Sequence, residues 1–332
     1  MHMFAAFYFV IVLTIEKEWN ISYDQLIRLW SLGALLIGLG AIPFGWLSDK
    51  WSRSGTMTIM FIGMGLASIL CGLSTSVSFL FFSLSLLGLF CSIYHPVGIP
   101  WVIHAANKQG RALGVNGIFG GVGIGSGAFV AGTLTELLNW QLAFILPGLI
   151  SIIIGFILIY LILIDKISYK NYFIKNDDRD HSRNEMILIA LIMLLSMFAL
   201  GLSFHNTQTA LPKVFEIRIG NTSSIQIGFM IAIIYFISGV TTFVGGLLAD
   251  RFNLKTIYLI GIFLQFPCYL GIAYISGYSL VVLCVLAAVF NASILPTENL
   301  LLGKFTPQKY HGVVYGIKFI LAFGSGPISV FL

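Results

Sequence analysis

Gly45-Trp46-Leu47-Ser48-Asp49-Lys50 ends one apolar stretch of this chain, and Gly246-Leu247-Leu248-Ala249-Asp250-Arg251 ends another, 201 residues later. In both segments the glycine is followed four residues later by an aspartate and then by a basic residue. The similarity continues near the same offset: Gly114 and Asn116 correspond to Gly316 and Lys318, and the segment around His95 corresponds to that around Glu298. Self-similarity at such a long period predicts a duplicated structural unit.

The composition places this duplication in a membrane. Of the 332 residues, 58% are hydrophobic and 9% are charged, whereas soluble domains carry about 25% charged residues. So few charges cannot cover the surface of a water-soluble fold. A spanning helix needs about 20 mostly apolar residues, and we therefore expect an all-α membrane protein with eleven spans: 1–15, 27–48, 56–73, 79–103, 112–135, 141–164, 186–211, 224–249, 256–275, 278–302 and 312–332.

The basic residues orient these spans. Thirteen Lys and Arg residues fall in one set of connecting segments, including the polar stretch 165–185, and four fall in the opposite set. The positive-inside rule places the richer set in the cytoplasm. This predicts a multi-pass protein of the inner (plasma) membrane with a cytoplasmic 165–185 linker, and it explains the net charge of +5 without a nucleic-acid partner.

Both ends of the sequence are unusual for such a protein. The first apolar run reaches Glu16 after fifteen residues, and Leu332 ends the eleventh run. A duplication of six helices predicts a twelfth span, which this sequence lacks. We expect a trimmed sequence, with a natural eleven-helix protein as the alternative.

The two quoted segments resemble the signature loop of the major facilitator superfamily, G-x-L-[AS]-D-[KR]-x-[GS]-R, which ends at Arg53 here. The first copy departs from the family pattern at Ser52 and Ser54, and the second has Asn253 where glycine is expected, a position where asparagine tolerates a left-handed backbone. The resemblance covers the whole chain. It implies two pseudo-symmetric six-helix bundles, residues 1–164 and an incomplete 186–332, joined by the linker 165–185.

The resemblance also implies a gate built from Gly45, Asp49, Lys50, Arg53, Gly246, Asp250 and Arg251. A carboxylate at Asp49 suits the positive N-terminal end of a neighbouring helix, which in the superfamily is the eleventh, beginning here near His311 and Gly312. Arg53 would bind the same carboxylate. The alternative is that Asp49 and Arg53 only cap and anchor a helix end.

Glycines on the fifth span resemble the antiporter pattern of the superfamily. Gly114, Gly123, Gly127 and Gly132 occupy its positions, with Ala128 in place of the proline and Ala131 in place of a glycine. Small residues let helices approach closely, so packing against a helix of the other half explains them as well as an antiporter role does. In the fourth span, Tyr94-His95-Pro96 resembles an F-H-P element of the fosmidomycin-resistance-like branch.

Ionisable and polar groups within spans are candidates for function. His95 can carry a proton or contact an anionic substrate, or it can be satisfied by carbonyls at a kink made by Pro96. Glu298 and Lys318 lie at similar depth on successive spans, so they can form a gate ion pair or a proton site, unless Lys318 reaches the interface. Its repeat mate Asn116 is neutral. His205, Asn206 and Gln208 form a polar cluster that lines a cavity or lies near the surface.

Together these features predict a secondary active transporter that works by alternating access and exports a small organic molecule in exchange for protons. Uptake of a small organic anion by the same fold, and a non-transporting sensor or fragment derived from a transporter, stay open as alternatives. The sequence contains no nucleotide-binding loop and no metal-ligand motif. We therefore expect no enzyme activity, no cofactor and no metal, and a monomer whose partners are the substrate, the proton and the lipid bilayer.

Overall fold

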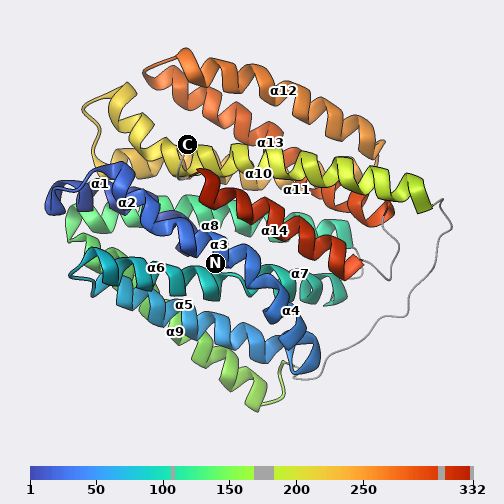
Figure 1. Ribbon diagram of the computed structural model, residues 1–332, viewed down its shortest axis with the longest axis horizontal. Helices are drawn as coiled ribbons and strands as arrows, with labels where there is room; N and C mark the ends of the chain where they lie inside the picture. The colour runs from blue at the N-terminus through green and yellow to red at the C-terminus, as the bar shows by residue number, and fades with distance from the viewer. Residues whose placement is uncertain (106–108, 168–182, 306–310, 330–332) are drawn as a thin grey trace.

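In the computed structural model, residues 1–105, 109–167, 183–305 and 311–329 are described, and within these ranges the chain folds into helices without a strand. The helices are α1 (His2–Trp19), α2 (Tyr23–Ile27), the 3-10 turn η1 (Arg28–Trp30), α3 (Ser31–Leu39), α4 (Ala41–Lys50), α5 (Arg53–Gly72), α6 (Val77–Cys91), α7 (Tyr94–Ala105), α8 (Gln109–Leu137), α9 (Trp140–Leu163), α10 (Arg183–Ile219), α11 (Ser224–Ala249), α12 (Leu254–Tyr274), α13 (Tyr278–Phe305) and α14 (His311–Ser329). They run roughly side by side along the long axis of the molecule (Figure 1).

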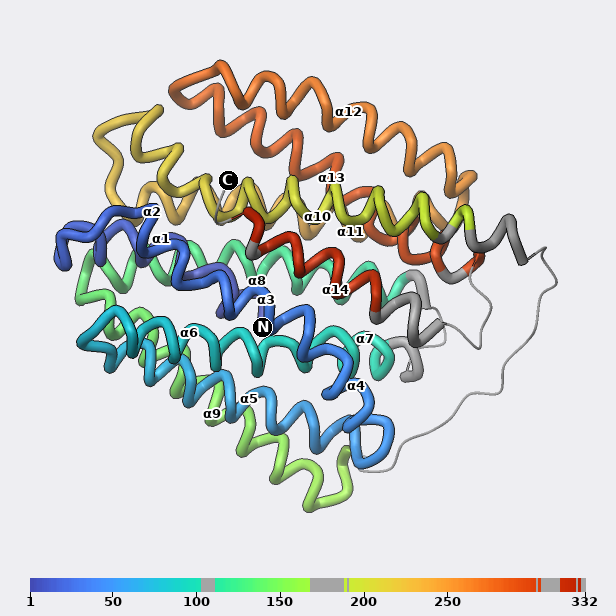
Figure 2. The backbone as a smooth tube through the Cα atoms, in the orientation of Figure 1, coloured from blue at the N-terminus to red at the C-terminus, as the bar shows by residue number. Residues whose placement is uncertain are grey.

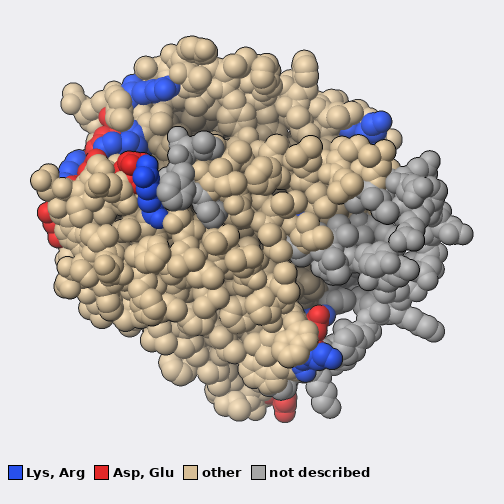
Figure 3. All heavy atoms as spheres, in the orientation of Figure 1, with Lys and Arg blue, Asp and Glu red and all other residues tan. Residues whose placement is uncertain are grey.

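The helices have the length and surface of membrane spans. In the described part of the chain, nine segments are long and apolar enough to cross a bilayer, and α1 and α14 complete the eleven predicted spans. Large apolar side chains cover the outside, as with Phe156 on α9 (60% exposed) and Phe263 on α12 (76% exposed). On the visible face the charged side chains lie near the two ends of the molecule, with a wide uncharged band between them (Figure 3). The prediction of an all-α multi-pass membrane protein is confirmed.

The helices form two groups that meet along the centre of the molecule. In the first, α5 packs against α6 and α9, and α3 packs against α6; in the second, α13 packs against α11 and α12, and α10 packs against α14. Contact between the groups comes from α8 with α11, α3 with α14, and α1 with α10. Figure 2 shows the two groups lying side by side, with α9 at the end of the first and α10 at the start of the second. Most of the 165–185 segment between them in the sequence lies outside the described residues.

The duplicated loops are alike in backbone as well as in sequence. Ser52 has φ −165° and accepts a hydrogen bond from the amide of Gly55, and it thereby caps the N-terminus of α5. Asn253, 201 residues later, has φ −64° and caps α12 through the amide of Thr256. The left-handed backbone that asparagine would tolerate at Asn253 is not used, because the loop uses this position as an extended N-cap, for which serine and asparagine are both well suited.

Four predicted spans differ from the helices observed. The span expected at 27–48 begins at Tyr23 and is divided into α2, η1, α3 and α4. α1 continues past Glu16 to Trp19, since the charged side chains of this last turn find partners, among them Lys213. α10 continues through Pro212 to Ile219 instead of ending at 211. The fourth span breaks at Ser92–Ile93, ahead of the predicted kink at Pro96. Pro96 lies in the first turn of α7, where a missing backbone donor costs nothing.

The four cysteines are buried and free, and they serve as small packing residues. The core between the helices is rich in aromatic rings; Phe7 and Phe144, for example, pack edge to face at 5.0 Å and join α1 to α9. This packing positions the helices that carry the polar groups considered next.

Candidate functional site

The contact between α8 and α11 is backbone against backbone. A methyl group added at Gly121 would lie 2.5 Å from the carbonyl oxygen of Tyr235, and one added at Gly125 would lie 2.8 Å from that of Ala232. Glycines on both helices, spaced by about one turn, therefore let the two groups of helices approach as closely as backbone allows.

The four glycines of the predicted motif do not share this face. Gly132 meets the carbonyl of Ser224, and Gly114 meets Phe243, so these two face α11. Gly123 and Gly127 instead face the start of α1, where a methyl group on Gly127 would lie 2.7 Å from the carbonyl of Met3. The expectation that the whole motif packs against the other half was thus wrong for two of its four members, because their spacing turns them to another side of α8.

A buried ion pair joins α13 and α14. The Lys318 Nζ lies 2.8 Å from the Glu298 Oε1, and the two side chains are 7% and 4% exposed. Lys318 also donates to the side-chain oxygen of Asn299. On α12, Tyr258 lies within electrostatic range of Glu298 and shares a 2.6 Å hydrogen bond with Ser196 of α10. The pairing that the sequence allowed is therefore present, and Lys318 does not extend to the interface.

Between the two groups lies a pocket that we call the central pocket. Helices of both groups line it: α1, α3 and α8 from the first, α10 and α14 from the second, together with the turn η1. As it stands the pocket admits only a few water-sized molecules. Its lining residues are Met1, His2, Ala5, Trp30, Ala34, Ile37, Ile124, Phe204, His205, Gln208 and Phe323.

The predicted polar cluster of α10 lies at this pocket. His205 and Gln208 line it, and the side-chain oxygen of Asn206 is buried without a hydrogen-bond partner among the described residues. Of the two alternatives for this cluster, the structure favours the wall of a cavity over simple nearness to the surface.

His95 lies beside the central pocket among aromatic rings. Its ring stacks on Phe319 at 5.2 Å and contacts Phe323 at 4.8 Å. Neither ring nitrogen has a hydrogen-bond partner in the described part of the chain, so of the two alternatives for His95 the one in which carbonyls near Pro96 satisfy it is not what the structure shows. Its neighbour Tyr94 donates its hydroxyl hydrogen to Asn116 of α8, which ties Asn116 to α7.

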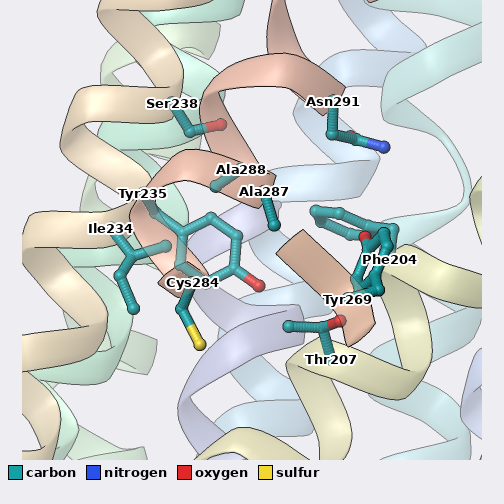
Figure 4. Close-up of a pocket in the computed structure, with 10 residues that line it drawn as sticks. All are labelled: Phe204, Thr207, Ile234, Tyr235, Ser238, Tyr269, Cys284, Ala287, Ala288 and Asn291. Atoms are coloured by element: carbon teal, nitrogen blue, oxygen red, sulfur yellow. The ribbon is translucent and has the colours of Figure 1, made fainter. Parts of the chain in front are cut away.

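A second pocket lies within the second group of helices, and we call it the lateral pocket. Its ten lining residues are Phe204, Thr207, Ile234, Tyr235, Ser238, Tyr269, Cys284, Ala287, Ala288 and Asn291 (Figure 4). Phe204 lines both pockets, and its ring meets Tyr235 edge to face at 6.0 Å. The lateral pocket is also small. Phe204 therefore separates two small pockets, each lined in part by polar side chains.

The signature loops lie at the ends of α4 and α11. Arg53 approaches Asp49 to 3.8 Å, a long ion pair in which Asp49 is 64% exposed. A methyl group on Gly45 would lie 3.2 Å from Pro96, so α4 crosses α7 closely at this point. The expected contact of Asp49 with His311 and Gly312 lies outside the residues whose side chains the structure describes. In the second copy, Asp250 is the C-cap of α11 and Gly246 is buried. The basic residue that follows the aspartate is exposed in both copies, as Lys50 in the first and as Arg251 in the second.

At the opposite end of the molecule, an ion network that the sequence did not predict joins the two groups. Lys213 of α10 lies 2.7 Å from Glu16 of α1 and 2.8 Å from Glu216 of its own helix. Lys17 of α1 lies 3.2 Å from Glu216. Nearby, the Tyr23 hydroxyl donates to the Thr209 carbonyl at 2.8 Å. These contacts hold α1 and α2 against α10.

Glu136 makes a further contact between the two groups at this end, which the sequence did not predict. Although exposed, its carboxylate accepts the backbone amide of Ile225 at 3.0 Å and so joins the end of α8 to the start of α11. Sequence position alone gave no signal for these partners, since the paired residues are separated by 89 and by 197 positions.

Comparison with known proteins agrees with this architecture. A family model described as the Major Facilitator Superfamily matches residues 1–330. Crystal structures of a bacterial homolog of the human lysosomal transporter Spinster, in inward-facing occupied and unoccupied conformations, have TM-scores of 0.74 and 0.73 at 14% and 15% identity. The matches cover 99% and 98% of this chain, and 77% and 78% of those chains.

Curated relatives are similar over parts of their length. The riboflavin transporter RibZ of Clostridioides difficile is 29% identical over 43% of this chain and 32% of its own. An uncharacterized transporter of Buchnera aphidicola is 24% identical over 71% of this chain and 57% of its own. The puromycin resistance protein pur8 of Streptomyces alboniger is 29% identical over 34% of this chain and 24% of its own. The chain thus spans between a quarter and three fifths of the length of these relatives.

Proposed function

The chain belongs to the major facilitator superfamily, and from this premise we propose that it is a secondary active transporter that moves a small organic molecule by alternating access. The observation that carries the proposal is the central pocket, which side chains of both helix groups line at their junction. A site placed there is exposed to one side or the other when the two groups rock about it.

We assign the moving units to residues 1–164 and 186–332, with 165–185 as the cytoplasmic linker. The contact of α8 with α11 supports this assignment, because at Gly121, Gly125 and Gly132 it is made of backbone, and no side chains interlock at these positions to oppose rocking. In this scheme Asp49 and Arg53, with Asp250 and Arg251 in the second copy, hold the cytoplasmic ends together. The protein would work as a monomer in the inner membrane, the basic loops facing the cytoplasm.

Glu298 is the proposed proton carrier. Separating the two charges of so deeply buried an ion pair is unfavourable, because each would be left buried without its partner. A proton taken up by Glu298 removes its negative charge and so releases Lys318 from the pair. Asn299, already bonded to Lys318, and Tyr258, beside Glu298, are the polar groups that can accompany this change. The pair then couples protonation to the packing of α13 against α14.

Export is the proposed direction. Support comes from the puromycin resistance protein among the relatives. The small-residue motif of α8 adds less, because Ala128 replaces the proline of the family's antiporter pattern. The similarity of Tyr94-His95-Pro96 to the fosmidomycin-resistance-like branch is consistent with it. Uptake of an organic anion is less favoured, because Glu298 neutralises Lys318 and leaves no net positive charge for an anion.

Purified protein in liposomes loaded with a pH-sensitive dye tests the proposal. With the lumen more acidic than the outside, adding riboflavin or puromycin to the parent protein should drive substrate inward as protons leave. E298Q should abolish the coupled proton signal, while D24N, which changes an exposed carboxylate at the other end of the molecule, should leave it unchanged. Proton flux that persists in E298Q would refute the assignment of the carrier. Absence of any transport in the parent would favour a sensor.

A further inference from the structure

His95, Phe319 and Phe323 form a stack of rings across the junction of the two helix groups. His95 belongs to α7, whereas both phenylalanines belong to α14. The His95 ring is nearly parallel to that of Phe319, at an interplanar angle of 29° and 5.2 Å between centroids, and it lies 4.8 Å from Phe323. The two phenylalanine rings are themselves nearly parallel, at 22° and 6.2 Å. Flat aromatic faces from opposite groups therefore meet at this point.

The stack opens directly onto the central pocket. Phe323 lines the pocket, and its other side contacts the His205 ring at 6.0 Å. Trp30 and Phe204 add two more rings to the lining, and no Asp, Glu, Lys or Arg is among the lining residues. A ligand of this pocket meets aromatic surface, imidazole edges and the amide of Gln208, but no charged side chain.

Both ring nitrogens of His95 are buried and lack a hydrogen-bond partner among the described residues. A neutral imidazole offers one N–H donor and one acceptor nitrogen. Leaving such groups unpaired is unfavourable, since each loses its bond to water. A ligand whose rim carries both an acceptor and a donor would restore the two bonds.

We propose that the stack is the recognition site for a planar heteroaromatic substrate, which inserts between His95 on one face and the Phe319–Phe323 pair on the other and bonds its donor and acceptor groups to the imidazole edge. This inference rests on the proposed function, because the rings separate only when α7 and α14 move apart as the groups rock. In the closed arrangement His95 packs on Phe319 and Phe323 themselves, so these rings fill the space that the substrate takes.

Binding measured separately from transport tests this proposal. Riboflavin is a suitable probe because it is planar, carries donors and acceptors on its ring edge, and loses fluorescence when it stacks on aromatic rings. Titrating the purified parent protein should quench riboflavin fluorescence, and excess adenosine should compete, whereas ribitol, which lacks the ring system, should not. F323L should weaken binding about tenfold, and F323Y, which keeps the ring, should restore it.

Two further variants separate stacking from general damage. H95F keeps a flat ring but removes both nitrogens, and it should weaken riboflavin binding about tenfold. F156L removes an exposed ring from the outer surface of α9, where Phe156 is 60% exposed and the helix packs against α5 of the same group, and should bind like the parent. Failure of riboflavin, adenosine and puromycin alike to bind the parent, or equal binding by F323L and the parent, would overturn the proposal. Proton-coupled transport of a non-aromatic compound would then show that the proposed function holds without it.

Discussion

Replacement of Lys213 by methionine should open the end of the molecule at which α1 meets α10. The lysine ammonium lies 2.7 Å from Glu16 and 2.8 Å from Glu216, so the two carboxylate oxygens are at most 5.5 Å apart. In K213M they face each other across the junction, and only Lys17, 3.2 Å from Glu216, remains to offset their repulsion. At this separation two like charges repel by about 0.8 kcal/mol in water and about 3 kcal/mol at an effective dielectric constant of 20. All three side chains are between 22% and 28% exposed, which argues for the middle of that range.

A penalty of about 1–2 kcal/mol should shift the equilibrium toward the open arrangement by a factor of about 5 to 30. Gln208, which is 9% exposed and lines the central pocket, reports the change. In a Q208C background, the rate of labelling by a membrane-impermeant maleimide added from this side should rise by that factor, and high salt should reduce the difference.

Two controls belong to this experiment. K213R keeps the charge and should label at the parental rate. R28M removes an ion pair within one helix, between Arg28 and Asp24, and should have no effect because that pair does not cross the junction. If K213M labels no faster than the parent, or if R28M accelerates labelling equally, the network does not hold the two groups together.

Three further outcomes are expected. G121L should separate α8 from α11, because its side chain would meet the Tyr235 carbonyl at 2.5 Å; the melting temperature should fall, and an unchanged value would contradict the backbone contact. K318M should be destabilised by about 3–5 kcal/mol, since it leaves Glu298 buried and unpaired, and K318M/E298M should recover most of the loss in a denaturant titration; a double variant as unstable as K318M would argue against the pair. S68A removes a buried 2.6 Å hydrogen bond from α5 to a carbonyl of α9 and should cost about 1 kcal/mol in a denaturant titration. S203A, which loses only an exposed hydrogen bond to a carbonyl of its own helix, is the comparison, and an equal loss in both variants would contradict the reasoning.

Much of the fold could be predicted because its determinants are local or repeated. Apolar runs of spanning length and the asymmetry of basic residues follow from the bilayer itself, and the 201-residue offset relates Ser52 to Asn253 as well as Asp49 to Asp250. That offset predicts equivalent positions but not their conformations. The extended backbone at Asn253 shows that a helix cap, and not a left-handed turn, is what the two loops share.

Helix interruptions were harder to predict, since proline has opposite effects at different positions. Pro212 lies within α10 and does not end it, whereas Pro96 lies in the first turn of α7, after a break that has already occurred. Neighbouring helices satisfy the backbone groups that a proline frees in a membrane span, and those neighbours are not visible in the local sequence.

The site could be predicted in its residue types and not in its partners. Charged groups within spans identified Glu298 and Lys318, whose similar depth made a pair geometrically reasonable. The partners of Lys213 depend instead on the packing of α1 against α10, which brings together residues 197 positions apart. The unpaired edge of His95 was equally hidden, because the hydrogen-bond partners of a buried ring depend on which groups the neighbouring helices bring to it.

The Glu298–Lys318 pair also has an electrical consequence. While intact, the pair carries no net charge, so rocking of α13 and α14 moves no charge through the membrane field at this site. A proton on Glu298 leaves Lys318 as a single positive charge, and that charge experiences the membrane potential, which is worth about 2.3 kcal/mol per elementary charge per 100 mV for a full crossing. The protonated and unprotonated carriers would therefore respond differently to voltage, and a membrane potential would act on only one limb of the transport cycle.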